Sequence, residues 1–381
     1  MRWDFVQLGE LYEVHNGLSK GRQFFGRGYP FLSFSIVFNN WFLPKMLPDL
    51  VQSSDKERES YSILRGDVFI TRTSETMDEL GMSSVALMDY PNATYNGFTK
   101  RLRPIDKKRI LPEYIGYYLR CNEFRSKFIA FSTMTTRASL RNEDLLSIKV
   151  PVPPLDIQRR IADILSTYDD LIENNRKQIK LLEEAAQRLY KEWFVDLRFP
   201  GHEHTRIVDG VPEGWEKKQL SDVVEVKYGK DHKSIPDGNV PVYGSGGLMR
   251  KCNQMLYKGE SVLIPRKGSL NNIIYVDEAF WTVDTMFYTK MKWPNIGVFI
   301  YYFIKSFDMY AMNIGAAVPS MTTNTLNSIN VIIPSCEILK NFQSTTKVYF
   351  RKIELLKRQI EMAVQARNHL LPKLMSGEVE E

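Results

Sequence analysis

Few residues in this chain have the types and the spacing that chemistry requires. His202 and His204 stand one residue apart, a spacing that metal ligands use, but Pro200 and Gly201 precede them and the nearby sequence offers no third ligand. We interpret this histidine pair as part of a loop and predict no metal site. Three carboxylates in turn-like stretches are interpreted in a similar way, as turn or capping residues: Asp67, Asp222 and Asp284.

The sequence also lacks the common catalytic motifs. It contains no phosphate-binding Walker A loop, no GxSxG nucleophile turn, no HExxH pair and no dinucleotide-binding GxGxxG. The Asp/Asn-Pro-Pro-aromatic tetrapeptide of amino-methyltransferases is absent too, because Pro153-Pro154-Leu155 lacks both flanking residues. We therefore predict no catalytic residues and expect that the chain is not an enzyme by itself.

The dominant pattern is a long amphipathic helix over residues 153–194. Its seam residues recur at alternating spacings of three and four, as in a coiled coil. Asp156 is expected to cap the helix start, and Pro154 to block its extension backwards. About 35 residues make a rod on the order of 50 Å long, which we interpret as a spacer. The seam consists of Leu165, Tyr168, Ile172, Asn175, Ile179, Leu182, Ala186, Leu189 and Trp193.

The chain repeats itself. An offset of 181 residues carries Leu165 onto Thr346 and reproduces the seam, while near the N-terminus an offset of 212 carries Trp3 onto Trp215. The first half therefore holds about thirty more residues, and we expect positions 39–60 to be a mostly exposed excursion. The second seam consists of Thr346, Tyr349, Ile353, Leu356, Ile360, Ala363, Arg367, Leu370 and Leu374.

Strand and helix signals mix in both halves, so we predict the α+β class. Gly66–Arg72 indicates a turn feeding a strand, and Lys258–Gly268 mirrors it before presenting two cations. Leu8–Val14 and Pro112–Lys127 indicate helices. Lys20–Tyr29 is interpreted as a basic loop interleaved with aromatic residues.

The expected order is globular unit, long helix, globular unit, long helix. We predict a first globular domain over residues 1–152, a first spacer helix over 153–200, a second globular domain over 201–334 and a second helix over 335–381. If the second helix buries its seam against the first, the two run antiparallel and the chain is a pseudo-twofold repeat. The alternative is that each helix packs on its own globular unit as an ordinary amphipathic helix.

Composition bounds the class of protein. With 381 residues, 43% hydrophobic and 25% charged, the chain is long enough for two globular domains. Its three cysteines, odd in number and widely spaced, argue against a disulfide framework and favour a reducing compartment. The densest apolar run, residues 298–304, is too short to span a bilayer, so we expect no membrane association and a cytoplasmic location. A formal net charge of +6 is weak evidence for a nucleic-acid partner.

Several local motifs, taken together, resemble the DNA-specificity (S) subunits of type I restriction–modification systems, and the resemblance covers nearly the whole chain. The second helix departs from the pattern, because Ile338–Phe342 lacks the QxxIA motif with which the first begins. The motifs are PPLDIQRRIADIL at 153–165, IENNR at 172–176, FVD at 194–196, VPEGW at 211–215, YGSGG at 243–247 and DTMF at 284–287.

The resemblance implies a division of labour. This chain would supply two target-recognition domains and a helical spacer, and would bind double-stranded DNA. A separate methyltransferase subunit, in two copies, would bring S-adenosylmethionine and methylate adenine, and an ATP-dependent restriction subunit would complete the complex. No cofactor is then expected on this chain. Because the two units differ in their loops, and DNA repeats about every 34 Å, the target should be split and asymmetric, with an unread gap.

Two groups of candidate site residues follow. Loops with cations or polar groups at matched places are expected to contact phosphates or bases, with plain surface charge as the alternative. These are Lys20, Arg22, Arg27, Arg72, Ser74 and Arg137 in the first unit, and Lys230, His232, Lys233, Arg250, Lys251, Arg266 and Lys267 in the second. The outer faces of the first helix are expected to contact the partner subunits, through Arg160, Asp163, Asp170, Arg176, Lys180, Glu183 and Lys191.

Two further functions remain open at this point. The chain could be the specificity partner of a two-subunit nuclease–methyltransferase, with the same DNA-binding role. It could also be a paired-domain scaffold that uses its helices for assembly and does not bind DNA. Salt dependence separates the scaffold from both other functions, because DNA binding releases counterions.

Overall fold

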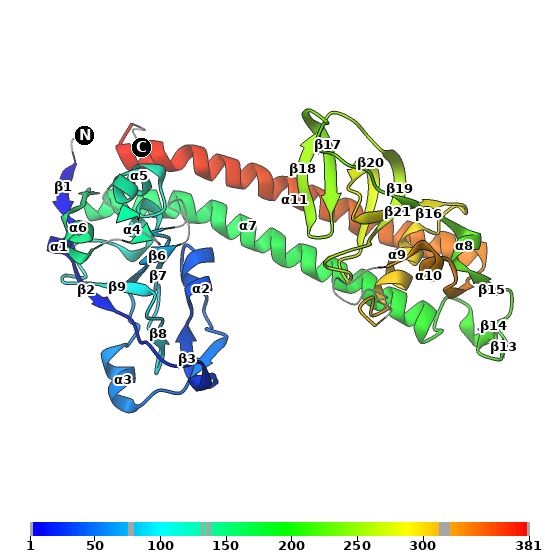
Figure 1. Ribbon diagram of the computed structural model, residues 1–381, viewed down its shortest axis with the longest axis horizontal. Coiled ribbons are helices and arrows are strands. Elements are labelled where there is room, and N and C mark those ends of the chain that lie inside the picture. The colour runs from blue at the N-terminus through cyan, green and yellow to red at the C-terminus, as the bar shows by residue number, and fades with distance from the viewer. Residues whose placement is uncertain are drawn as a thin grey trace. The chain divides into compact units, whose positions relative to one another are not determined.

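The computed structural model describes residues 3–74, 80–130, 133–134, 138–139, 141–311 and 321–378. The chain forms two compact units (Figure 1): unit 1 comprises Met1–Asn175 with Arg358–Glu381, and unit 2 comprises Arg176–Lys357. Helices and strands mix in both units, which confirms the α+β class. The domain boundaries expected at residues 152, 200 and 334 stay predictions.

Unit 1 is built around a four-stranded antiparallel sheet. Its strands, in spatial order, are β2 (Tyr12–Asn16), β9 (Thr99–Pro104), β5 (Val68–Thr71) and β7 (Ser83–Val85). A second sheet holds β4 (Asp49–Val51), β3 (Phe25–Leu32) and β8 (Thr94–Tyr95). The remaining strands are β1 (Asp4–Gln7) paired with β12 (Lys149–Val152), and β10 (Thr133–Met134), β11 (Ala138–Ser139) and β6 (Thr73–Ser74).

The helices of unit 1 are short apart from the two that run on into unit 2. The short ones are α1 (Leu8–Leu11), the 3-10 turn η1 (Arg22–Phe24), α2 (Phe34–Asn39), α3 (Asp55–Ser60), α4 (Pro112–Tyr118), α5 (Asn122–Ala130) and α6 (Asn142–Ser147). The long ones are α7 (Leu155–Tyr190) and α11 (Cys336–Ser376).

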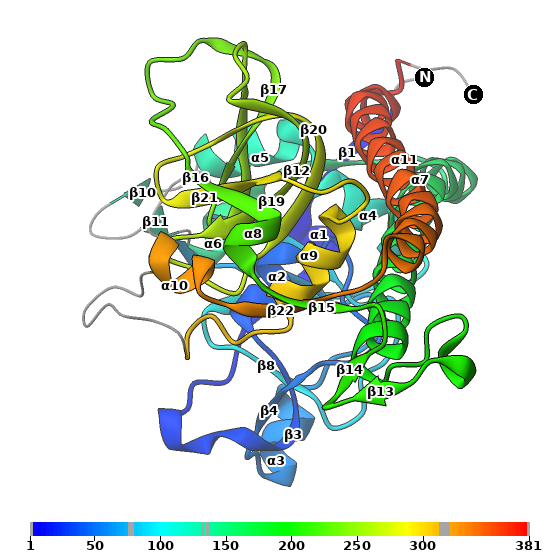
Figure 2. The same ribbon diagram turned by 90° about the vertical axis from the view of Figure 1, so that its right-hand side faces the viewer.

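Unit 2 has one six-stranded sheet, and α9 packs against its strands β19 and β20 (Figure 2). In spatial order the strands are β16 (Val224–Tyr228), β21 (Met286–Met291), β19 (Tyr257–Pro265), β20 (Ile274–Thr282), β17 (Asp237–Gly244) and β18 (Gly247–Cys252). Two further pairs are β15 (Glu216–Gln219) with β22 (Asn330–Ile333), and β13 (Ile207–Val208) with β14 (Val211–Pro212). The helical elements are the π turn η2 (Lys191–Val195), the 3-10 turn η3 (His202–His204), α8 (Leu220–Val223), α9 (Gly297–Lys305) and α10 (Thr323–Asn327).

The internal repeat is confirmed for two pairs of strands. In unit 1, β1 pairs antiparallel with β12 and places Gln7 opposite Lys149; in unit 2, β15 pairs antiparallel with β22 and places Gln219 opposite Asn330. These positions differ by the offsets of 212 and 181 residues seen in the sequence. The short helix after each strand begins with a capping box, and Asp222 supplies the carboxylate in unit 2, as its interpretation as a capping residue requires.

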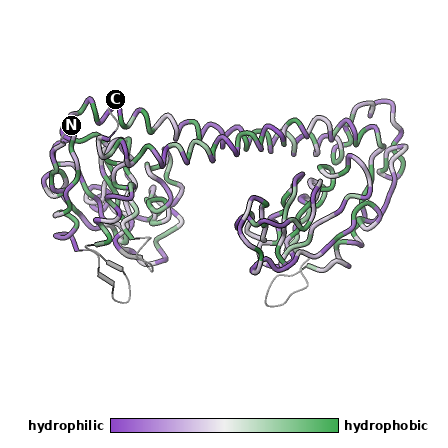
Figure 3. The backbone as a smooth tube through the Cα atoms, turned by 90° about the horizontal axis from the view of Figure 1, so that it is seen from above, coloured by the Kyte–Doolittle hydropathy of each residue, from purple (hydrophilic) through white to green (hydrophobic). Residues whose placement is uncertain are grey.

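Both long helices bury their seams. Every residue predicted for either seam is buried or half-buried, and hydrophobic and hydrophilic residues alternate along both helices (Figure 3). In unit 1, Asp169 of α7 pairs with Arg367 of α11, and Asn175 donates to Gln359 at 3.2 Å. Residue numbers rise on one helix as they fall on the other, so these two segments run antiparallel.

The long helices also pack against the globular cores. In unit 1, Leu165, Leu371 and Leu374 belong to the same hydrophobic cluster as Tyr114 of α4. In unit 2, Tyr190 contacts Phe299 of α9 and Phe342 of α11, with ring centroids 5.9 and 6.3 Å apart. Helix-on-helix packing and helix-on-domain packing, which the sequence presented as alternatives, therefore occur together within each unit.

Several local expectations were wrong. α7 begins at Leu155, so Asp156 lies inside the first turn rather than at the cap. The segment 39–60 is not a mostly exposed excursion, because Leu43 and Leu47 enter a hydrophobic cluster with Phe69 of β5, and β4 and α3 form within it. The basic stretch 20–29 is not all loop, since η1 and β3 begin there.

Two predicted helices also differ from those observed. Leu8–Val14 is a helix only as far as Leu11, because Tyr12 and Val14 pair with β9 as a strand. Pro112–Lys127 is two helices, α4 and α5; the break brings Tyr118 and Phe124 into edge-to-face contact in one core. In the part of the chain described, no helix combines the length and the apolar character needed to cross a bilayer.

Candidate nucleic-acid interface

Arg72 and Arg266 occupy equivalent positions in the two units. Each directly follows an interior strand of the main sheet, β5 in unit 1 and β19 in unit 2. The backbone N–H of Arg72 donates to the carbonyl of Phe98 at 3.0 Å, and that of Arg266 to the carbonyl of Thr285 at 2.8 Å. Each of these carbonyls lies one residue before the adjacent strand, β9 or β21. The same backbone hydrogen bond therefore fixes both arginines at the end of the same strand.

The two guanidinium groups share a second property. Neither forms an ion pair or a side-chain hydrogen bond with any residue that the structure describes, and the Nε of each is out of contact with solvent. A donor in this position costs free energy unless something else binds it. Both side chains are half-buried. The arrangement leaves each guanidinium available to a ligand.

The neighbours of Arg72 in unit 1 are polar. Asn16 and Lys100 face each other across β2 and β9. Burial lowers the pKa of Lys100, and the nearby charge of Arg72 lowers it further. Lys100 also donates to Asn142 of α6. Two predicted contacts cannot be placed: β6 pairs its backbone with β11, but the side chain of Ser74 and the whole of Arg137 lie outside the described residues.

The neighbours of Arg266 in unit 2 are aromatic. Tyr228, half exposed, takes the position of Asn16, and Phe287 takes that of Lys100. The guanidinium carbon of Arg266 lies 5.6 Å from the ring centroid of Tyr228, within the range of a cation–π contact. Tyr228 meets Phe287 edge to face at 5.0 Å. Lys267, the next residue along the chain, is exposed.

The other predicted cations of unit 1 divide into two kinds. Lys20 is committed to internal contacts, because its ammonium donates to the carbonyl of Gln52 at 2.7 Å and to the carboxylate of Glu57 at 2.8 Å. That hydrogen bond lowers the pKa of Glu57. Arg22 and Arg27, in contrast, are exposed on η1 and β3. They remain available for phosphate contacts.

In unit 2, Arg250 holds a loop in place. Its guanidinium pairs with Asp237 at 2.8 Å, lies 3.2 Å from Nδ1 of His232 and donates to the carbonyl of Ile235 at 2.7 Å. Arg250 and His232 therefore fasten the loop between β16 and β17 to β18. The remaining predicted cations of this region are exposed: Lys230, Lys233 and Lys251.

All seven residues predicted to contact partner subunits are exposed. Six lie on α7 and one, Lys191, directly follows it. Arg160 lies 3.7 Å from Asp156, and Lys180 lies 3.9 Å from Glu184, one helical turn away in each case. Surface pairs of this kind contribute little to stability.

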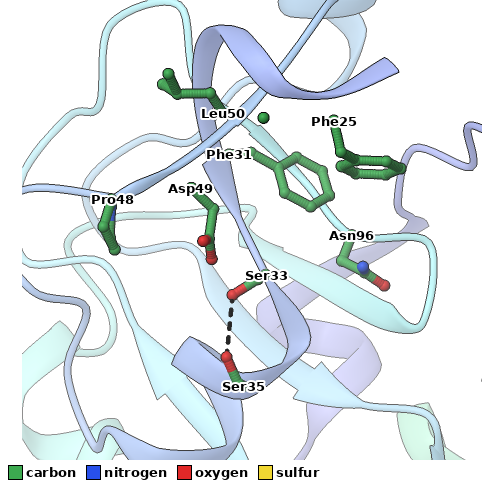
Figure 4. A pocket seen from close by; sticks show the side chains of 9 residues that line it. Phe25, Phe31, Ser33, Ser35, Pro48, Asp49, Leu50 and Asn96 are labelled. Carbon is green, nitrogen blue, oxygen red and sulfur yellow. Dashed lines mark hydrogen bonds between the residues drawn. The ribbon is translucent and has the colours of Figure 1, made fainter. Parts of the chain in front are cut away.

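Unit 1 contains a hollow of about 410 Å³ that was not predicted from the sequence (Figure 4). Its polar groups include the carboxylate of Asp49 and the amide of Asn96, and its apolar wall includes Phe25 and Phe31, whose ring centroids are 5.2 Å apart. Asp49 forms no ion pair with the residues described. The only sequence signal was the group of aromatic residues around Phe25, which the structure leaves partly exposed.

The described ranges hold no group of three or more His, Cys, Asp or Glu residues that could bind a metal ion. His202 bonds instead to the carbonyl of Phe199, with its Nδ1 at 2.9 Å. Asp67 is a turn residue, as predicted: its carboxylate accepts from the backbone N–H of Leu64 at 2.8 Å and is bound in bidentate fashion by Arg103. The chemistry on offer is therefore recognition by arginine, other cations and aromatic rings.

Comparison with known proteins agrees with the repeat and with this chemistry. A sequence model of the type I restriction modification DNA specificity domain matches residues 1–184 and residues 212–365. The chain belongs to this family. Its role is that of a specificity subunit, which directs a restriction–modification enzyme to DNA and carries no catalytic centre of its own.

Known specificity subunits match this chain over almost their whole length and almost its whole length. The specificity subunit of the type I restriction enzyme MjaIX from Methanocaldococcus jannaschii is 25% identical over 99% of this chain and 93% of that protein. The HindI specificity subunit from Haemophilus influenzae is 23% identical, with 99% of both chains covered. The crystal structure of the type I S subunit from M. genitalium has a TM-score of 0.62 at 16% identity and covers 98% of this chain and 96% of that one. At this identity the likeness concerns the fold.

Proposed function

We propose that the chain recognises a split, asymmetric DNA sequence, with one half read by unit 1 and the other by unit 2. The observation that carries this proposal is the pair of equivalent arginines, Arg72 and Arg266, in two copies of one domain. Their surroundings differ, because Asn16 and Lys100 are polar where Tyr228 and Phe287 are aromatic. Two copies with the same anchor and different neighbours would read different half-sites.

The long helices would set the unread gap between the half-sites. α7 has 36 residues, which at 1.5 Å each make a helix of about 54 Å. One turn of DNA measures about 34 Å, so a spacer of this length suits units placed one to one and a half turns apart. In this proposal, the residues predicted as spacer, 153–200 and 335–381, act as a ruler, and an antiparallel pair carries the second unit away from the first.

The proposal gives the partners their tasks. Two methyltransferase subunits would bind the exposed charged face of α7 and methylate adenine with S-adenosylmethionine, while a restriction subunit would use ATP. This chain would bind neither cofactor. The charged face, which includes Asp163, Asp170 and Glu183, is accessible as such binding requires. The complex would act where the DNA is, in the cytoplasm.

Salt dependence of binding tests the proposal against a scaffold that does not bind DNA. The complex of this chain with its methyltransferase subunits is titrated with a labelled duplex in 50 to 300 mM salt, and binding is followed by fluorescence anisotropy. If several cations contact phosphates, the logarithm of the affinity falls linearly with that of the salt concentration, with a slope of about −0.9 for each phosphate contacted. The methyltransferase subunits alone are the control. A complex that binds no more tightly than this control, at any salt concentration, contradicts the proposal.

A further inference from the structure

We infer that Arg72 and Arg266 each read a guanine, one in each half of the target, and that the side chains beside them make the two halves different. This inference rests on the proposed function and narrows the thirteen predicted contacts to two equivalent readers. It also assigns a role to Tyr228, which orients Arg266 and was not among the predicted residues.

The two units share the arginine but not the residues around it. The arginine, its place after an interior strand and its backbone hydrogen bond recur in both units. The residues beside it do not: Asn16 becomes Tyr228 and Lys100 becomes Phe287. An arginine that served only local packing would have to fit a polar setting in one unit and an aromatic setting in the other. A shared external ligand explains why the same side chain suits both.

Leaving the two guanidinium groups without a hydrogen-bond partner costs free energy. The Nε of each arginine is shielded from water and has no hydrogen-bond partner in the described part of the chain. Arg250, in contrast, has all of its guanidinium nitrogens engaged by Asp237, His232 and Ile235. In unit 2, therefore, a structural arginine has a partner for each of its guanidinium nitrogens. A ligand would supply the hydrogen-bond partners that Arg72 and Arg266 lack.

The position of Arg266 suits a base better than a phosphate. A flexible cation can reach a phosphate. Two parallel hydrogen bonds to guanine O6 and N7, in contrast, need a planar group on a backbone that is held in place. The backbone of Arg266 is held in this way: its N–H donates to the carbonyl of Thr285, and its carbonyl accepts from the N–H of Met321 at 2.9 Å. The ring of Tyr228 restricts the guanidinium from one side. Flexible, exposed cations such as Lys251 fit phosphates better.

The neighbours then supply the difference between the half-sites. Unit 1 carries the exposed amide of Asn16 at the position of Tyr228, so that it can form further hydrogen bonds to base edges. Beside Arg266, the exposed ring of Tyr228 offers apolar contact, which suits the methyl group of thymine. Unit 1 should therefore tolerate fewer substitutions next to its guanine than unit 2.

The test measures the preference for each base position rather than affinity alone. The complex with the methyltransferase subunits methylates a library of duplexes in which every target position is varied, and sequencing reads out the methylated members. Arg266→Lys keeps the charge but loses the paired hydrogen bonds. We expect it to reduce discrimination at one guanine by about tenfold to a hundredfold and to leave the other half-site unchanged. Arg72→Lys should do the same in the other half.

Tyr228 is tested as a positioning residue. Tyr228→Phe keeps the ring and should keep the preference for guanine, whereas Tyr228→Ala should relax it at the same position as Arg266→Lys. The matched controls are the exposed cations Lys45 in unit 1 and Lys258 in unit 2, each changed to alanine. Thermal unfolding of every variant identifies any that fails to fold.

Three outcomes would overturn the inference. A uniform loss of affinity over all sequences in Arg72→Ala or Arg266→Ala, with the salt slope reduced by about one, would assign that arginine to a phosphate. An unchanged base preference and an unchanged affinity in the lysine variants and in Arg72→Ala and Arg266→Ala would remove both arginines from the interface. Loss of discrimination at the same target position in Arg72→Lys and in Arg266→Lys would contradict the inference that each half-site is read by its own arginine. A wild-type complex without any split preference is a different result, because it would contradict the proposed function itself.

Discussion

The ion pair between Asp67 and Arg103 should be one of the stronger single contributions to the stability of unit 1. The carboxylate is fully buried, accepts from Arg103 at 2.8 and 2.6 Å, and also accepts from a backbone N–H at the turn before β5. Asp55 and Arg58 form an ion pair of the same chemistry, but the side chain of Asp55 is 98% exposed. The two pairs thus separate the effect of burial from that of charge.

The perturbation is Asp67→Asn, which keeps the shape and one acceptor but removes the charge. Loss of one partner of a buried pair costs about 3–5 kcal/mol. Arg103 remains a quarter exposed and keeps its hydrogen bond to the carbonyl of Ser62 at 2.9 Å, so we expect the low end, about 3 kcal/mol. This corresponds to a local opening equilibrium raised about a hundredfold. Asp55→Asn should cost no more than about 1 kcal/mol.

Hydrogen exchange followed by mass spectrometry measures this opening directly. Peptides that cover β5 and β9 should exchange about a hundredfold faster in Asp67→Asn than in the unchanged chain, and no more than about fivefold faster in Asp55→Asn. Equal exchange rates in the two variants would refute the reasoning, because burial would then not decide what the charge contributes.

Three further predictions concern other described residues. Arg120 donates to four backbone carbonyls around α2 and β7, so Arg120→Met should destabilise unit 1 by about 3 kcal/mol in thermal unfolding, and an unchanged midpoint would contradict this. Gln158 of α7 accepts from the N–H of Leu111 at the start of α4, so Gln158→Leu should cost about 1–3 kcal/mol and speed exchange at the N-terminus of α4, whereas unaltered exchange there would argue against this contact. Cys336 is exposed, while Cys252 is buried and burial raises the pKa of Cys121 to about 11; a thiol reagent at pH 8 should therefore modify one cysteine rapidly, and Cys336→Ser should abolish that phase. Rapid modification of a second thiol would show that a core opens more readily than the packing suggests.

The sequence was sufficient for features that depend on periodicity. Every residue of the two predicted heptad seams is buried or half-buried, because a helix repeats every 3.6 residues whatever surrounds it, although Tyr190, Phe342 and Leu371 are buried outside the seams. The offsets of 212 and 181 residues predicted that β1 and β12 of unit 1 correspond to β15 and β22 of unit 2. Both kinds of signal are local or self-referential, so a single sequence carries them.

The sequence was insufficient where long-range contacts decide the role of a side chain. Lys20 and Arg27 look alike in the sequence, but Lys20 meets Glu57, which lies 37 residues away, whereas Arg27 is exposed. Arg250 likewise finds partners on a distant loop. The hollow beside Phe25 and Asp49 is formed by elements that only the folded chain brings together. Which cations remain available is therefore a property of the tertiary structure.

The second helix illustrates the same limit. It lacks the QxxIA motif of the first, yet Gln343 accepts from the N–H of Val298 at the start of α9 at 3.3 Å. This contact corresponds to the one that Gln158 makes with α4 in unit 1. Gln343 lies one helical turn beyond the position that the 181-residue offset gives for Gln158, so a comparison by sequence position misses it.

The central claim is that this chain gives a methyltransferase its DNA target. The most direct measurement is a map of adenine methylation across the DNA of cells that make the chain together with its methyltransferase subunits, and of cells that lack only this chain. The account predicts a split, asymmetric methylated sequence that disappears when the chain is absent. An identical methylation pattern in the two kinds of cell would contradict it.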